Sequence, residues 1–180
     1  MKTLSILALS LILSSSAFGQ KYLSNESYIR FFSDAPLEDI EAVNEEARSV
    51  FDLETKKIVA TVPITGFQFE KKLMQEHFNE NYLESDKYPQ ATLTAELLDL
   101  DLNDPEKEVT ARGELTIHGQ TNEVTLKGTV VKNGDQVIID TVFMIELKDY
   151  KIKIPKAVFY NIAENVEVTV KFTYQPHETN

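Results

Sequence analysis

The sequence predicts an all-β fold, an antiparallel barrel or sandwich of about eight strands with one inserted helix. Three long segments alternate apolar and polar residues strictly, which is typical of strands with one dry and one wet face. They cover residues 107–117, 122–132 and 165–174. Asn133-Gly134 is a strong hairpin turn directly after the second segment. A closed barrel would also remove the exposed edges that long strands otherwise present to solvent.

The other elements are expected in order along the chain. Shorter strands are predicted at residues 26–33, 47–53, 58–65 and 91–97. Pro36 suits the first turn of a helix, so a short helical turn is predicted at residues 36–43. A longer helix is predicted at residues 70–82, because the apolar face of this segment falls at helical spacing: Leu73, Met74, His77 and Phe78.

Residues 137–147 are the eighth expected strand and differ from the others. The run Val142-Phe143-Met144-Ile145 is apolar on both faces of this strand. Strands of this kind are usually covered on both sides. We therefore expect the helix at residues 70–82 to pack over the outer face of this strand.

The first 19 residues have the features of a secretory signal peptide. Lys2 precedes an apolar run at residues 4–13, and Ala17 and Gly19 are small residues at the positions that a signal peptidase reads. Cleavage after Gly19 would leave residues 20–180 as one domain, with no Cys for a lipid anchor and no apolar run long enough for stable membrane insertion. We expect the protein in the periplasm or outside the cell.

Charge and composition exclude several classes of function. The formal net charge of −11 repels phosphate backbones, so nucleic-acid binding is not expected. The absence of Cys excludes disulfides and thiol chemistry. The three histidines, His77, His118 and His177, lie in segments with no reason to converge, so no metal site is expected. No nucleophile motif or glycine-rich phosphate loop occurs, and we expect neither an enzyme nor a cofactor.

Three segments resemble the signatures of a known family. Residues 77–89 read HFNENYLESDKYP and are followed by Ala91-Thr92-Leu93, residues 113–121 read GELTIHGQT, and residues 149–152 read DYKI. Together, in this order, they resemble the YceI-like family, and the resemblance covers nearly all of residues 20–180. Two features depart from the family pattern: the acidic segment 34–46 lacks glycine, and Leu93 stands where an aromatic residue is common.

The resemblance implies an extended, lipocalin-like, eight-stranded antiparallel β-barrel with one inserted helix. The family is associated with the binding of polyisoprenoids or other long-chain amphiphiles inside the barrel, usually in the bacterial periplasm and without known catalysis. It therefore implies that this chain is an exported lipid-binding or carrier protein that holds a polyisoprenoid- or fatty-acid-like ligand. A protein partner is not indicated, and a homodimer remains open.

Residues on the dry parity of the strands are the candidates for contact with such a ligand. They are Leu115, Ile117, Val124, Leu126, Ile139, Phe143, Ile145, Val168 and Val170. Aromatic residues supply further bulk that could either line or fill the interior: Phe31, Phe32, Phe67, Phe69, Phe143, Phe159, Tyr160 and Phe172. Small eight-stranded barrels are often full. The alternative is therefore a ligand-free structural or protein-interaction barrel with a filled core.

Overall fold

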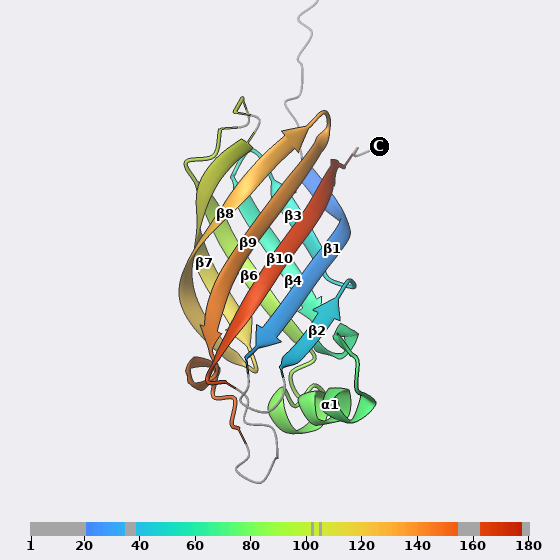
Figure 1. The fold of residues 1–180 in the computed structure, drawn as a ribbon. Coiled ribbons are helices and arrows are strands. Elements are labelled where there is room, and N and C mark those ends of the chain that lie inside the picture. Colours follow the sequence, from blue (N-terminus) through green and yellow to red (C-terminus); the bar gives the residue numbers. More distant parts are fainter. Residues whose placement is uncertain (1–20, 35–38, 102, 105, 155–162, 178–180) are drawn as a thin grey trace, which may run out of the picture.

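The computed structural model describes residues 21–34, 39–101, 103–104, 106–154 and 163–177. The expected signal peptide lies outside these residues, as do Phe159 and Tyr160. Ten antiparallel strands form one sheet that closes on itself through the pairing of β1 with β10 (Figure 1). Their bounds are β1 Lys21–Ser33, β2 Ile40–Asn44, β3 Arg48–Asp52, β4 Lys57–Pro63, β5 Gln68–Phe69, β6 Gln90–Leu98, β7 Glu106–Ile117, β8 Gln120–Asn133, β9 Gln136–Glu146 and β10 Asn165–Pro176.

These strands confirm the predicted eight-stranded barrel, because β2 and β3 share one position in the wall and β5 adds no position to the ring. β3 pairs with the first residues of β1, and β2 pairs with its last five. The remaining strands follow around the barrel in the order β4, β6, β7, β8, β9 and β10, each antiparallel to its neighbour. β5 pairs only with β2. Every long strand therefore has partners on both sides, as closure requires.

The prediction of a helical turn at residues 36–43 is wrong for residues 39–43, the part of this range that the structure describes. Residues 40–43 belong to β2, which pairs with β1 from Ser33 opposite Ile40 to Ile29 opposite Asn44. Ile40, Ala42 and Asn44 are buried on the same parity of the strand. Pairing with β1 thus overrides the local preference that Pro36 suggested.

The α-helix found in the described residues is shorter than predicted and lies at one end of the barrel. α1 spans Lys72–His77 and continues into a π-helical segment, η2, at Phe78–Tyr82 (Figure 1). Two short 3-10 turns, η1 at Ile64–Gly66 and η3 at Leu147–Tyr150, are found elsewhere in the chain. We refer to the end of the barrel near α1 as the helix end, and to the opposite end, where Lys21 and Pro176 lie, as the terminal end.

The prediction that the helix covers the outer face of β9 is wrong. Val142 and Met144 point outward from this strand and remain 57% and 58% exposed. Leu73, which was expected on the buried face of the helix, is 59% exposed. The helix instead directs Met74, Phe78 and Tyr82 toward the open end of the barrel, so nothing in the described part of the chain covers the outer face of β9.

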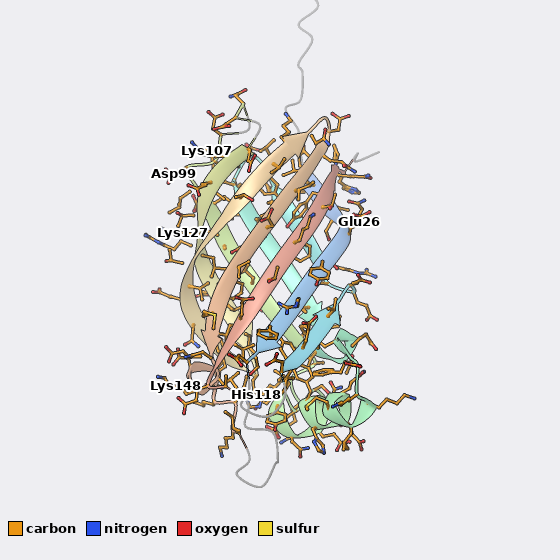
Figure 2. All side chains as sticks on the ribbon, in the orientation of Figure 1. Glu26, Asp99, Lys107, His118, Lys127 and Lys148 are labelled. Atoms are coloured by element: carbon orange, nitrogen blue, oxygen red, sulfur yellow. The ribbon has the colours of Figure 1, made fainter. Side chains whose placement is uncertain are left out.

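Apart from the exposed apolar side chains of β9, the barrel wall has a largely polar outer face and an apolar inner face. Charged side chains such as Lys127 and Glu26 project outward from the strands (Figure 2).

Gly113 marks a close approach between β7 and β6, because an ideal Cβ at this position would lie 2.0 Å from the carbonyl oxygen of Thr94. Glycine is therefore required there, since any larger residue would force the two strands apart.

The terminal end of the barrel is packed solid. Tyr174, Phe51 and Val137 are completely buried there, and Leu97 and Val130 are 1% exposed. The hydroxyl groups of Tyr174 and Ser49 are 2.7 Å apart, and Ser49 also donates to the carbonyl oxygen of Val59 at 3.0 Å. In this half of the barrel, the side chains themselves fill the interior.

Candidate functional site

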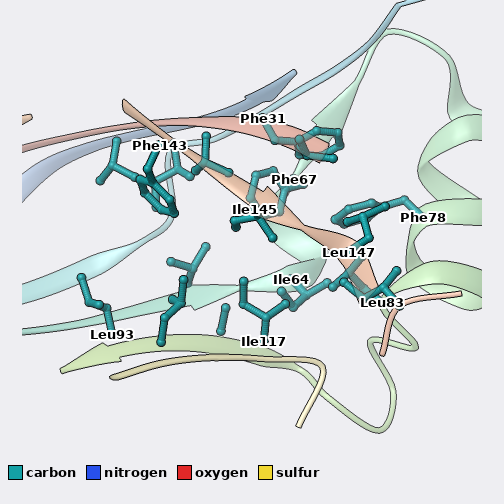
Figure 3. Close-up of a pocket in the computed structure, with 18 of the residues that line it drawn as sticks. Phe31, Ile64, Phe67, Phe78, Leu83, Leu93, Ile117, Phe143, Ile145 and Leu147 are labelled. Carbon is teal, nitrogen blue, oxygen red and sulfur yellow. The ribbon is translucent and has the colours of Figure 1, made fainter. Parts of the chain in front are cut away.

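The half of the barrel near the helix end contains an apolar cavity of about 190 Å³. Figure 3 shows its side chains converging from several strands and from the segment around α1. Of the described residues that line the cavity, Thr92, Thr141 and Tyr82 are the ones with a polar group. The hydroxyl of Thr141 is already used, because it donates to the carbonyl oxygen of Lys127 at 2.6 Å. The lining therefore favours an apolar guest over a polar one.

Seven of the nine residues expected from strand parity lie in the lining of this cavity: Leu115, Ile117, Leu126, Phe143, Ile145, Val168 and Val170. Ile139 lies instead in the packed core toward the terminal end. Val124 packs against a second buried cluster near the helix end and is not part of the lining. Whether the seven contact a ligand stays a prediction.

Four phenylalanine rings form an aromatic cluster between the barrel and the helix. Phe78 stacks on Phe31 with ring centres 5.4 Å apart, and it contacts Phe67 at 5.5 Å and Phe69 at 5.0 Å. All four line the cavity. The cluster joins β1, β5 and η2, so it holds the helical segment against the mouth of the barrel. Phe32, in contrast, points outward beneath the guanidinium of Arg30, which lies 4.8 Å from its ring centre.

Strand parity alone could not identify the lining that comes from outside the long strands. These residues are Ile64, Phe67, Met74, Phe78, Tyr82, Leu83, Leu147 and Ile152. They lie in short helical segments and loops, where no period-two pattern exists. The available signal was the family signature, because Phe78, Tyr82, Leu83 and Ile152 fall within its quoted segments.

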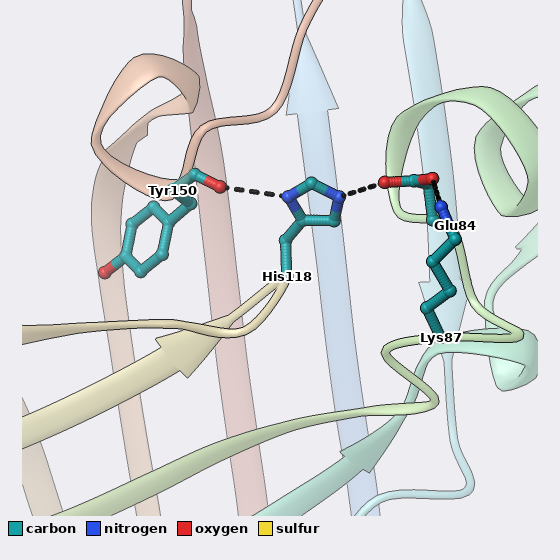
Figure 4. A network of polar contacts seen from close by, with 4 residues as sticks. All are labelled: Glu84, Lys87, His118 and Tyr150. Carbon is teal, nitrogen blue, oxygen red and sulfur yellow. Dashed lines mark hydrogen bonds and ion pairs between the residues drawn. The ribbon is translucent and has the colours of Figure 1, made fainter.

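A polar network next to the cavity joins the three segments that carry the family resemblance. The ring of His118 lies between Glu84 and η3 (Figure 4). Its Nε2 is 3.1 Å from a carboxylate oxygen of Glu84, and its Nδ1 is 3.1 Å from the carbonyl oxygen of Tyr150. Lys87 also binds Glu84, and the ring of Tyr88 packs edge-on against His118 at 4.5 Å. One residue therefore ties the β7–β8 turn to the segments on both sides of it.

The chemistry of this network indicates a structural clamp. Both partners of the His118 ring are oxygen acceptors, so only the doubly protonated imidazolium can donate both hydrogen bonds. Two hydrogen bonds lower the pKa of the Glu84 carboxyl, and the one from Lys87 has the larger effect, ahead of the one from His118. His118 itself adopts a left-handed backbone conformation with φ of 51°, followed by Gly119 at φ of 69°. This tight turn aims the imidazole at both partners.

Tyr82 carries an unsatisfied polar group beside the cavity. Its side chain is buried, and its hydroxyl has no hydrogen-bond partner within the described residues. Burial raises the pKa of this hydroxyl above its usual value. The group therefore stays neutral and retains the capacity to donate one hydrogen bond.

The described residues also bear on metal binding and on helical membrane spans. Within that part of the chain, no three His, Cys, Asp or Glu side chains are grouped so that they could hold a metal ion. None of the helices described has the length and apolar character needed to cross a bilayer.

Solved structures of several bacterial proteins share this fold. A polyisoprenoid binding domain from Saccharophagus degradans, implicated in plant cell wall breakdown, aligns with a TM-score of 0.75 and 14% identity, over 87% of this chain and 98% of that one. BcnA from Burkholderia cenocepacia aligns with a TM-score of 0.68 and 20% identity, over 82% of this chain and 95% of that one. The YCEI protein of Campylobacter jejuni aligns with a TM-score of 0.57 and 18% identity, over 82% of this chain and 86% of that one.

No match was found among curated proteins. The family comparison, by contrast, covers most of the chain, since residues 25–174 match the YceI-like domain. This range runs from β1 to β10 and includes both the cavity and the His118 network. The chain therefore belongs to the YceI-like family.

Proposed function

We propose that this protein is an exported carrier that holds one long apolar chain, isoprenoid or fatty-acyl in character, in the cavity at the helix end. The observation that carries the proposal is the cavity itself, an interior space of about 190 Å³ with an almost wholly apolar lining. Burial of each methylene contributes about 0.8 kcal/mol, so even a short stretch of chain can offset the cost of association. The proposed role is binding rather than catalysis.

Family membership and one of the structural relatives support this ligand class. The Saccharophagus degradans domain is described as polyisoprenoid binding, and its fold matches that of the present barrel. We propose that the ligand enters at the helix end, because packed side chains fill the terminal end. A polar head group would then remain near the mouth, since none of the described lining residues carries a charge to receive it.

Export is proposed from the first 19 residues, which have the charge, apolar run and small residues of a signal peptide. Fractionation of the source cells, with N-terminal sequencing of the recovered protein, tests this part. A mature chain that starts at Gln20 in the periplasmic or extracellular fraction is expected. An intact Met1 in the cytoplasmic or membrane fraction would contradict it.

The binding proposal is tested by solvent extraction of the native protein followed by mass spectrometry. We expect a long-chain lipid in the extract. The substitution Val168→Phe places a ring in the cavity, because Val168 is in its lining, and should lower lipid recovery about tenfold or more. Val142→Phe is the matched control, since Val142 lies on the neighbouring strand but points outward.

The alternative is a ligand-free structural or interaction barrel, which the packed terminal end favours in part. This alternative gains support if the native protein carries no lipid and binds neither an isoprenoid nor a fatty-acid probe. Equal lipid recovery from the Val168→Phe and Val142→Phe proteins would instead show that the lipid binds outside the cavity.

A further inference from the structure

The cavity ends on a row of four aromatic rings, which we call the aromatic plug: Phe172, Tyr174, Phe51 and Tyr22. Phe172 lines the cavity, and its ring centre is 5.8 Å from that of Tyr174. Tyr174 contacts Phe51 at 6.1 Å, and Phe51 contacts Tyr22 at 6.1 Å. The last three rings are not part of the cavity lining. The plug therefore fills the barrel from the floor of the cavity toward the terminal end.

The plug is held from several sides. Tyr174 and Phe51 are 0% exposed, and the hydrogen bond between Tyr174 and Ser49 anchors the second ring to β3. The side chains of Leu97, Val130 and Val137 surround the plug and leave almost none of its surface accessible to solvent. Close-packed interiors resist displacement of a ring, because every neighbour would have to move as well. An apolar chain in the cavity thus meets a firm floor at Phe172.

We infer that Phe172 limits the length of apolar chain that this protein can bury. The inference rests on the proposed function and adds a length limit to it. An apolar cavity of about 150 Å³ holds benzene, so the cavity of about 190 Å³ accommodates about eight carbon atoms of a chain. Carbons beyond that number remain at the helix end and gain little from binding.

The test uses delipidated protein and straight-chain fatty acids of increasing length, measured by isothermal titration calorimetry. For the unaltered protein, affinity should rise about fourfold for each methylene that enters the cavity. The rise should stop at about eight buried carbons, which gives a plateau. Phe172→Ala removes the ring that forms the floor, so the rise should continue for up to about six further carbons, the number in that ring.

Val137→Ala is the matched control. Val137 is fully buried at the terminal end and is not part of the cavity lining. This substitution also removes core volume, but the plug still separates the new space from the ligand. The plateau should therefore stay at the chain length of the unaltered protein. Phe172→Leu, a smaller change, should move the plateau by fewer carbons and serves if Phe172→Ala does not fold.

The outcomes separate the inference from the proposed function. If the unaltered protein binds no fatty acid and no isoprenoid of any length, the proposed function is wrong and the inference falls with it. If it binds, but the plateau of the Phe172 variants stays where it was, the length limit lies elsewhere and only the inference is overturned. A plateau that shifts equally in Val137→Ala would also overturn it, because general loosening of the core would then explain the change.

Discussion

Replacement of Tyr174 by Phe should change how the stability of the barrel depends on pH. The Tyr174 hydroxyl is buried in the aromatic plug and shares a hydrogen bond of 2.7 Å with Ser49. Burial raises the pKa of this hydroxyl far above its ordinary value, an effect only partly opposed by the hydrogen bond. In the unfolded chain the same group titrates near pH 10, as a free tyrosine does.

The sign and size of the effect follow from this difference. Below pH 10 the group is neutral in both states, and Tyr174→Phe loses one hydrogen bond, which costs about 1 kcal/mol. Ser49 still donates to Val59, so no orphaned group adds to that cost. Above pH 10 the unfolded chain releases a proton that the folded state retains, so the unaltered protein loses about 1.4 kcal/mol of stability per pH unit relative to the variant.

The two stability curves should therefore cross at about pH 11. Urea unfolding of both proteins from pH 8 to 11.5 measures the difference directly. Tyr22, Tyr82 and Tyr150 also have raised pKa values, but they occur in both proteins and cancel in the comparison. If the difference in unfolding free energy stays constant across this range, the Tyr174 hydroxyl titrates equally in both states and our description of the plug is wrong.

Three further predictions concern other parts of the barrel. Gly113→Ala should lower the free energy of unfolding in urea by about 2–3 kcal/mol, because its Cβ would meet a backbone carbonyl. Gly134→Asn, in an open turn, should lower it by about 0.5 kcal/mol or less. Met144→Gln should change stability by no more than about 0.5 kcal/mol, since the side chain is exposed; a larger loss would indicate a covered face. His118→Leu removes the donor that joins Glu84 to η3, so calorimetry should show a lower melting temperature; an unchanged value would refute the clamp.

Much of the barrel wall could be predicted from local patterns. In β7, β8 and β10 the inner face is dry and the outer face is wet, so burial selects alternating residue types along each strand. Alternation predicts a first strand that begins at residue 26, whereas β1 begins at residue 21, because a bulge between Ser24 and Glu26 breaks the alternation. Local pattern does not indicate β2, because its pairing with β1, rather than its own composition, makes it a strand.

The candidate site could be predicted only in part, for a related reason. Parity tells which residues point into a barrel, and it placed Phe143 and Ile139 on the same inner face. It does not tell whether a residue lies at a level of the barrel that is hollow or at one that side chains fill. Phe143 lines the cavity while Ile139, four residues earlier on the same strand, belongs to the packed core.

Residue type and local order are enough to predict the inward and outward faces of the strands, the family, and the apolar character of the interior. Which half of the barrel is hollow becomes visible once the strands close into the barrel. That depends on whether Tyr22, Phe51, Phe172 and Tyr174 meet, and these rings come from strands at opposite ends of the chain. The position of the helix over the mouth, which leaves Val142 and Met144 exposed, likewise follows from packing, because a helix packs where its apolar face buries the most surface.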